Sequence, residues 1–336
     1  MAHEVKECPE LREAAQEPFS LADHAGLTGI GPSVSAHDRR LALRERLTAR
    51  EPLVVPGVTD AMGIRLVERA GFKGAYATGA GLVNVQFGLP DLGLVGLSEV
   101  VEQVGRLTNA GGLPVIVDAD TGYGGPLSAM RTVRLLERIG AAAIQLEDQE
   151  MPKRCGHFDD HRLISTGHMQ AKIAAALAAR EDETLVLIAR TDARSAGSID
   201  EAIQRARAYA EAGADAIFVE APRTVEELAR VGQELPEVPL IVNVVEGGKT
   251  PELTVDEYGE LGFSVVLFAN YLMRSAIHAG QQALVHLREK GETRSYADRI
   301  VSWQGRQELF NLPAFTRAER HYDRSWSPSS DQEGIR

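Results

Sequence analysis

The most constraining feature of the sequence is an alternation of short apolar runs with amphipathic stretches, which occurs eight times between residues 53 and 290. Each apolar run has the length of a buried strand, and the amphipathic stretches have helical spacing. Strands that alternate with helices form a parallel sheet, and eight such units predict a closed (β/α)8 barrel. An open, doubly wound sheet is the alternative, although it would usually have fewer strands. The predicted strands are 53–56, 75–78, 113–118, 142–146, 185–190, 216–219, 240–244 and 265–268.

Glycines mark several of the predicted helix ends. Gly71, Gly140, Gly213 and Gly262 each stand between an amphipathic stretch and the next apolar run. Glycine adopts the left-handed conformation that commonly ends a helix. These positions therefore support the same alternation of helices and strands.

The chain extends beyond the predicted barrel at both ends. Residues 1–36 lack periodicity and predict a flexible N-terminal arm. The barrel itself is expected over residues 37–290. Helix-like pieces at 291–325 exceed what a barrel needs, and we expect them to pack on the barrel or on a neighbouring subunit. Residues 326–336 are rich in Ser and charge and predict a disordered tail.

Charge and composition narrow the choice of partners. The chain has 48 acidic and 36 basic residues, a net charge of −12, which argues against nucleic acid or an anionic membrane as partner. No apolar run reaches transmembrane length, and residues 1–21 carry five acids without the apolar core of a secretory signal. The two cysteines, Cys8 and Cys155, fit a reducing compartment. We therefore expect a cytoplasmic protein that acts on a small molecule, and this molecule can still be an anion.

Acidic residues stand at the C-terminal ends of the predicted strands, where a parallel barrel carries its active site. Asp118 and Asp120 follow the third strand, and Glu147 follows the fourth. Buried carboxylates are costly unless they are paired or bound to metal, and an oxygen-rich site suits Mg²⁺, with Mn²⁺ as a substitute. Any one of these acids could instead cap a helix or pair with Arg190 or Lys249. Their convergence at one face favours a metal site.

A short segment at residues 153–157, read Lys-Arg-Cys-Gly-His, places one thiol among cations. Lys153, Arg154 and His157 surround Cys155 in sequence, and cations lower a thiol pKa and make it a competent proton donor or nucleophile. A lone cysteine is more often an ordinary loop residue. The acidic strand ends nearby are what favour a functional cysteine here.

Six segments, in this order, resemble the isocitrate lyase/phosphoenolpyruvate mutase superfamily. They are residues 89–93, 117–124, 146–149, 153–157, 189–193 and 246–251, and the likeness spans about residues 45–325. The resemblance implies a Mg²⁺-dependent (β/α)8 barrel. It also implies a homotetramer whose eighth helix is exchanged between subunits, which fits the extra C-terminal helices.

The resemblance also implies roles for single residues. Asp118 matches the direct metal ligand, and Asp91, Asp120 and Glu147 match the acids around the ion, several of which act through water. Cys155 matches a catalytic cysteine on a mobile loop that closes over the substrate. The resemblance implies substrate contacts at Thr78, Gly79, Ala80, Arg190, Glu220 and Asn243. Tyr76 and Asp91 are further candidate substrate-binding residues, and Arg274 could bind a distal carboxylate of the substrate.

The implied activity is carbon–carbon cleavage, because the lyases of the superfamily carry the Lys-Arg-Cys-Gly-His segment and its mutases and hydrolases generally lack it. A 2-alkylmalate or methylisocitrate-type 2-hydroxy acid would give pyruvate, or another α-keto acid, plus a carboxylate. Cys155 would protonate the carbanion as general acid, while Lys153, Arg154 and His157 stabilise its charge. The likeness is greatest to the branch of 2-methylisocitrate lyase, 2,3-dimethylmalate lyase and carboxyphosphonoenolpyruvate mutase.

Other functions stay open at this point. A phosphonate-pathway mutase of the carboxyphosphonoenolpyruvate type or an oxaloacetate decarboxylase would use the same metal site. A non-catalytic barrel is a third hypothesis, against which the intact acidic set argues. The chain departs from many relatives at Phe268-Ala-Asn-Tyr271, where those relatives have a Pro, so Asn270 and Tyr271 could reshape the pocket.

Overall fold

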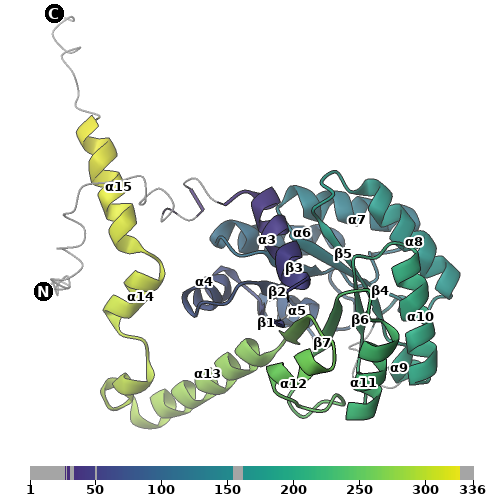
Figure 1. The fold of residues 1–336 in the computed structure, drawn as a ribbon. Coiled ribbons are helices and arrows are strands. Elements are labelled where there is room, and N and C mark those ends of the chain that lie inside the picture. Colours follow the sequence, from purple (N-terminus) through teal and green to yellow (C-terminus); the bar gives the residue numbers. More distant parts are fainter. Residues whose placement is uncertain (1–26, 28, 31–33, 50, 154–161, 326–336) are drawn as a thin grey trace, which may run out of the picture. The chain divides into compact units, whose positions relative to one another are not determined.

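A computed structural model describes residues 27, 29–30, 34–49, 51–153 and 162–325 of the chain. Eight parallel strands close into a barrel in chain order, and β8 pairs with β1 (Figure 1). The predicted (β/α)8 fold is therefore confirmed. The strands are β1 (Leu53–Val58), β2 (Ala75–Ala77), β3 (Val115–Asp118), β4 (Ala143–Glu147), β5 (Val186–Thr191), β6 (Ala216–Val219), β7 (Leu240–Asn243) and β8 (Val265–Phe268).

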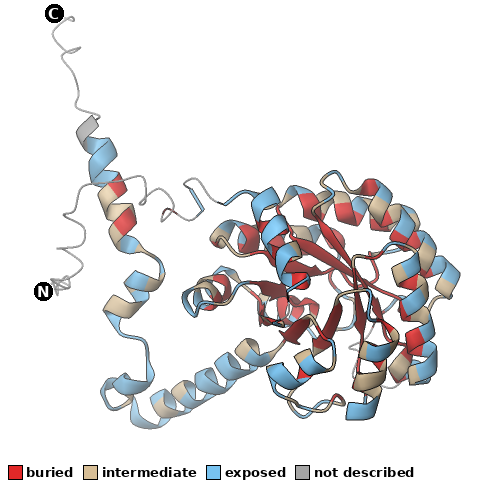
Figure 2. Cartoon of the chain, viewed as in Figure 1, coloured by how far each residue is buried: buried red, intermediate tan, exposed pale blue. Residues whose placement is uncertain are grey.

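Helices surround the strands and cover them with their apolar faces (Figure 2). Side chains that are buried in the helices, such as Ile64, Val104 and Leu136, pack between helix and strand. Burial of an aliphatic side chain of this size contributes roughly 1.5–3 kcal/mol. These helices are α4 (Ala61–Arg69), α5 (Gly79–Phe87), α6 (Leu97–Ala110), α7 (Pro126–Arg138), α8 (Thr166–Ala179), α9 (Ala193–Ala196), α10 (Ile199–Glu211), α11 (Val225–Glu234) and α12 (Val255–Glu260). The helix that follows β8, α13 (Tyr271–Lys290), has no buried residue.

The N-terminal end of the barrel is covered by α3 (Ala36–Leu47). Leu43 and Leu47 join the apolar cluster inside the barrel. Arg39 donates to the carbonyl of Thr108 at 2.8 Å, and Arg40 donates to the carbonyl of Ala141 at 2.9 Å. Since α3 covers this end, the opposite end, where the strands finish, is left for a site.

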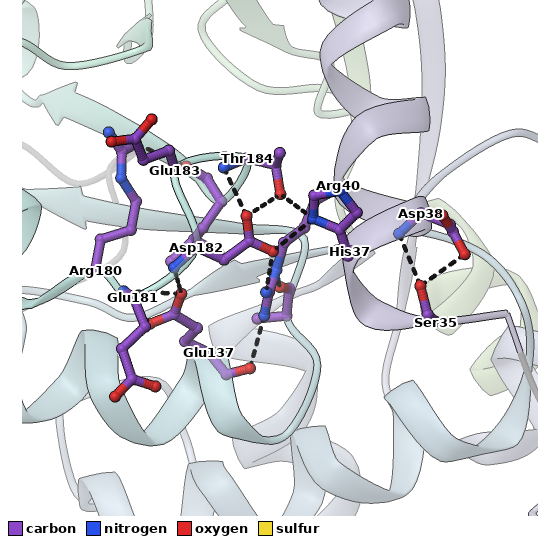
Figure 3. A network of polar contacts seen from close by, with 12 residues as sticks. Ser35, His37, Asp38, Arg40, Glu137, Arg180, Glu181, Asp182, Glu183 and Thr184 are labelled. Atoms are coloured by element: carbon purple, nitrogen blue, oxygen red, sulfur yellow. Dashed lines mark hydrogen bonds and ion pairs between the residues drawn. The ribbon is translucent and has the colours of Figure 1, made fainter.

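A polar network ties α3 to the turn between α8 and β5 (Figure 3). Asp182 accepts hydrogen bonds from Arg40 at 2.8 Å and from the backbone of Thr184 at 2.9 Å. Partial burial works against ionisation, yet the hydrogen bonds from Thr184 and Arg40 hold the pKa of Asp182 well below its usual range. Glu137, on the neighbouring helix α7, accepts from the backbone N–H of Asp182 at 2.7 Å. The network thus fixes the turn through charge-assisted hydrogen bonds.

The described residues divide into two units. Val34–His278 contains the barrel, and the chain from Ala279 onward belongs to the second unit with the described N-terminal residues. The second unit contains η1 (Arg294–Arg299), α14 (Trp303–Leu309) and α15 (Leu312–Ser325), and in it Leu27 packs against Ala314 and Ala318. None of the described helices has the length and apolar character that a membrane span needs.

Candidate active site

A pocket opens at the C-terminal end of the barrel. Seven of the eight strands contribute to it, either with their last residues or with the loops that follow, as expected for this fold. The lining residues are Tyr76, Thr78, Ala80, Asp91, Asp118, Glu147, Lys153, Arg190, Phe218, Glu220, Asn243, Val245, Leu267, Ala269 and Asn270.

Asp118 lies at the end of β3 and is held by two neighbouring elements. Its Oδ1 accepts from the side-chain amide of Gln145 at 3.2 Å, and its Oδ2 accepts from the backbone N–H of Gly79 at 3.3 Å. Gln145 in turn accepts from the hydroxyl of Tyr76 at 2.7 Å. A Cβ at position 79 would stand 2.9 Å from Asp118 Oδ2, so glycine is what lets α5 begin this close to the carboxylate.

Lys153 anchors the start of the Lys-Arg-Cys-Gly-His segment in the pocket. The side chain is only 5% exposed, and its Nζ lies 2.5 Å from Asp91 Oδ1 and 2.7 Å from Asp120 Oδ1. Burial acts to lower the pKa of Lys153, but Asp120, Asp118 and Glu147 raise it above its ordinary value. Lys153 is therefore a fixed positive charge that joins two acidic loops.

Arg190 forms the other cationic centre of the pocket. Its Nε and Nη2 bind the two oxygens of Asp192 at 3.0 and 2.7 Å, and it lies 3.5 Å from one oxygen each of Glu147 and Glu220. Its guanidinium also stands 5.2 Å from the centre of the Phe218 ring. Burial opposes its charge, yet the surrounding carboxylates keep the pKa of Arg190 above its ordinary value.

A second buried layer supports Asp192 from behind. Asp148 accepts from the Asp192 backbone N–H at 3.0 Å, from the Thr191 hydroxyl at 2.7 Å and from the Tyr209 hydroxyl at 2.7 Å. Arg205 also donates to Asp148, at 3.3 Å. Asp148 and Asp192 are both fully buried, so this network holds Arg190 on groups that water does not reach.

Among the residues that the structure describes, the acids that line the pocket outnumber the cations. Four described carboxylates, Asp91, Asp118, Glu147 and Glu220, line it together with two described cations, Lys153 and Arg190. Burial, aided by Asp118 against the pull of Lys153, raises the pKa of Asp120 to about 6. Burial, together with Asp192 and Asp118, likewise raises the pKa of Glu147 well above its usual range. The described residues of the pocket therefore carry more negative charge than Lys153 and Arg190 balance.

These carboxylates fit a hard divalent cation. Glu147 Oε1 is buried and accepts no hydrogen bond from the part of the chain that the structure describes, and a bound cation would supply both a partner and positive charge. Within the described ranges, no three Asp, Glu, His or Cys side chains form a group that could hold a metal unaided. Water and substrate oxygens would complete the coordination, which is how Mg²⁺ is usually held.

The structure brings most of the predicted site residues together. Gly79 and Asp120, which are not lining residues, contact the pocket through Asp118 and Lys153. Arg274 is not a lining residue either, because it donates to the carbonyl of Glu246 at 2.9 Å and pairs with its carboxylate at 2.8 Å. Arg154, Cys155 and His157 lie outside the described residues.

Sequence reasoning missed several residues that the structure places at or behind the pocket. Gln145 was detectable, because it is a polar residue in an apolar strand and precedes Glu147 by two positions, on the same strand face. Asp192 had no such signal, since an acid that follows an arginine could equally cap a helix. Phe218, Val245 and Leu267 appear in the sequence as ordinary core residues.

Comparison with known proteins agrees with this geometry. Residues 43–288 match the model of the family described as phosphoenolpyruvate phosphomutase. The chain is 42% identical to 2-methylisocitrate lyase of Aeropyrum pernix, over 81% of this chain and 86% of the relative. It is 39% identical to 2,3-dimethylmalate lyase of Eubacterium barkeri, over 83% of this chain and 96% of the relative.

Two solved structures extend the comparison. Oxaloacetate acetylhydrolase in complex with 3,3-difluorooxalacetate has a TM-score of 0.80 and 34% identity, covering 86% of this chain and 97% of its own. Phosphonopyruvate hydrolase in complex with oxalate and Mg²⁺ has a TM-score of 0.77 and 30% identity, covering 84% of this chain and 99% of its own. The similarity therefore includes enzymes with different reactions.

Proposed function

Because the chain belongs to the phosphoenolpyruvate phosphomutase family, we propose that it is a carbon–carbon lyase of 2-hydroxy acids. The substrate is a 2-alkylmalate or a methylisocitrate-type acid, and the products are pyruvate and a second carboxylate. The observation that carries this proposal is the pocket itself. It brings Arg190, held by Asp192, together with the acids Asp118 and Glu147, and it includes the anchored start of the Lys-Arg-Cys-Gly-His segment.

The substrate's 2-hydroxy acid end binds between Arg190 and the start of α5. Thr78 caps this nine-residue helix, and the N–H groups that follow it carry partial positive charge suited to a carboxylate. Arg190 binds the oxygens of the pyruvate-like half while Asp192 keeps its guanidinium plane fixed. Tyr76 and Asn243 complete the contacts on either side.

The bond between C2 and C3 of the substrate then breaks. The hydroxyl gives its proton to a carboxylate of the pocket, the C2–O bond becomes the carbonyl of pyruvate, and the electron pair of the broken bond stays on C3. Cys155 gives its proton to C3 as general acid. Lys153 lies two residues from Cys155 and is held by Asp91 and Asp120, so it supplies fixed positive charge next to the developing carbanion.

We propose Mg²⁺ as the metal, held by Asp118 directly and by Asp91, Asp120 and Glu147 largely through water. When bound, such an ion acidifies an alcohol and stabilises negative charge on oxygen. Support comes from the excess of carboxylates in the pocket and from the relative whose structure contains Mg²⁺ and oxalate.

A pyruvate-release assay tests the proposed function. The purified protein, with Mg²⁺ or with EDTA, is given 2-methylisocitrate, 2,3-dimethylmalate, citramalate, isocitrate, oxaloacetate and phosphonopyruvate. We expect Mg²⁺-dependent pyruvate from at least one of the substituted malates. Pyruvate from oxaloacetate or phosphonopyruvate alone, or oxalate and acetate from oxaloacetate, would replace the lyase with a decarboxylase or a hydrolase.

We also propose that the protein is a homotetramer that exchanges its C-terminal helices. In α13 no residue is buried, and its exposed side chains include Ile277, Leu284 and Leu287, which favours a covered position in an assembly. Light scattering should give about 146 kDa, four times the chain's 36.4 kDa. A mass of one chain would contradict the proposal.

A further inference from the structure

Asn270 lies shortly after Phe268, the last residue of β8, and it lines the pocket. Its side-chain oxygen Oδ1 is buried, and it accepts no hydrogen bond from the described residues. A buried acceptor without a partner costs about 1–3 kcal/mol, so such a group in a pocket calls for an explanation.

Asn270 stands at the start of α13, where its side-chain oxygen would be expected to accept a hydrogen bond. Its backbone carbonyl accepts the first hydrogen bond of α13, from Arg274 at 2.9 Å, so Asn270 occupies the N-cap of this helix. Asparagine at an N-cap normally uses its side-chain oxygen to accept from the backbone of the first turn, which stabilises a helix by about 1 kcal/mol. The Oδ1 of Asn270 makes no such bond. The chain therefore forgoes the usual cap while it keeps a residue suited to capping.

A second amide lines the same pocket as Asn270. Asn243 likewise has a buried Oδ1 that accepts no hydrogen bond from the described residues. The larger apolar side chains that line the pocket include Phe218, Val245 and Leu267. An alkyl group of a ligand can contact the apolar residues, whereas the two amides remain unsatisfied unless the ligand brings a polar atom to them.

We propose that Asn270 is a specificity-determining residue that selects substrates whose C3 substituent ends in a polar oxygen, over substrates whose C3 substituent is only alkyl. This inference rests on the proposed lyase function and names its substrate class. The amide of Asn270 offers both an acceptor, Oδ1, and a donor, Nδ2, so it binds a carboxylate or a hydroxyl at the end of a short arm. An alkyl arm leaves the buried acceptor without a partner and binds more weakly.

Substituted malates that differ only at C3 test the proposal. The C3 substituents, or arms, are methyl, hydroxymethyl and carboxymethyl. For each of the three substrates, kcat/KM is measured with the wild type, with Asn270→Leu and with Tyr271→Leu. Tyr271 is the matched control, since it is the next residue, is 58% exposed and does not line the pocket. The preference is the kcat/KM of the better polar substrate divided by that of the methyl substrate. We expect Asn270→Leu to lower this ratio by roughly 10- to 100-fold. Tyr271→Leu should keep the wild-type preference.

Comparison of the hydroxymethyl and carboxymethyl substrates shows whether Asn270 binds a hydroxyl or a carboxylate. An unchanged preference in Asn270→Leu would overturn the proposal. Thermal unfolding distinguishes a residue that selects the substrate from a residue that only caps the helix. A residue that only caps α13 would lower the melting temperature when replaced by Leu, whereas a residue reserved for a ligand would leave it equal or higher. A fall in melting temperature together with an equal loss for all three arms would therefore contradict the proposal.

A binding measurement keeps this inference distinct from the lyase proposal. If the wild-type protein releases no pyruvate from any of these acids, the lyase proposal fails. Titration calorimetry with succinate and with propionate then still tests Asn270. The wild type should prefer succinate, and Asn270→Leu should remove that preference. Equal ratios in both proteins would overturn the role of Asn270.

Discussion

Arg190 and Asp192 form a bidentate pair at the base of the pocket, with Nε 3.0 Å from Oδ2 and Nη2 2.7 Å from Oδ1. Both side chains are at least 90% buried, and Arg190 also faces Glu147 and Glu220. Asp192 therefore decides the orientation of the one guanidinium that lines the pocket within the described residues.

The first prediction concerns this pair. Asp192→Asn replaces one of the two acceptor oxygens by an amide donor, which cannot bind the guanidinium. We expect kcat/KM for the best substrate to fall at least about 100-fold, with a raised KM. Asp200→Asn is the matched control, because it breaks a surface pair with Arg230 in which Asp200 is 67% exposed. Steady-state kinetics that show equal KM values for the two variants would refute the positioning role.

The second prediction concerns the support behind the pair. Tyr209→Phe removes one hydrogen bond from Asp148 and leaves those from Thr191 and the Asp192 backbone. Because hydrogen bonds to charged groups contribute about 1.5–3 kcal/mol, urea unfolding should show a loss in that range. We expect kcat to fall less than about tenfold. An unfolding free energy equal to wild type would show that Asp148 does not depend on this hydroxyl.

The third prediction links a buried lysine to the metal site. Lys172 on α8 is 2% exposed and donates from Nζ to the carbonyl of Thr121, the residue after Asp120. Lys172→Met keeps an unbranched side chain that is one atom shorter, and it removes the donor. Outer groups that orient a metal site typically contribute 10- to 100-fold in affinity or activity. Mg²⁺ titration of the activity should therefore shift to at least about tenfold higher concentration, and an unchanged titration would contradict this account.

The fourth prediction concerns pH and stability at the opposite end of the barrel (Figure 3). The pKa of Asp182 is lowered in the folded protein, so its contribution is fully present above the ordinary Asp pKa of about 3.9. That contribution is lost as pH falls from there toward the lowered pKa. The Asp182 side chain is 21% exposed, and solvent screening limits its contribution to about 1 kcal/mol.

Urea unfolding of wild type and Asp182→Asn measures this contribution. The difference in unfolding free energy should be constant from pH 7 to pH 5 and should shrink as pH falls below about 4. A difference that grows on acidification would have the wrong sign for a carboxylate with a lowered pKa.

The barrel was predictable from sequence because its signal is repeated. Eight apolar runs, with glycines at helix ends such as Gly71 and Gly213, agree with one architecture, and the structure confirms it. The helix α5 was not predicted, since it opens with Gly-Ala-Gly, which is a poor helix-forming sequence. Its capping by Thr78 and its close approach to Asp118 explain why it forms there.

Those residues of the candidate site were predictable whose type is unusual at their position in the sequence. The partners of these residues were harder to predict. Asp118 and Glu147 are charged residues at the ends of buried strands, and both line the pocket. The partner of a charged residue depends on tertiary geometry, so the Glu246 contact of Arg274 and the Asp192 contact of Arg190 could not be derived from spacing. For Asn270, the departure from relatives is visible in the sequence, whereas the lack of a hydrogen bond to its Oδ1 from the described residues is visible only in the structure.

The most direct test of the lyase proposal is proton NMR of the reaction in deuterium oxide, with Mg²⁺ and the best substituted malate. Cleavage with protonation at C3 predicts equal amounts of pyruvate and of a second carboxylate that carries one deuteron at the former C3. EDTA should abolish both products, and Cys155→Ser should slow them by roughly 10²- to 10⁴-fold. Absence of pyruvate, or an unchanged rate in Cys155→Ser, would contradict the proposed lyase mechanism.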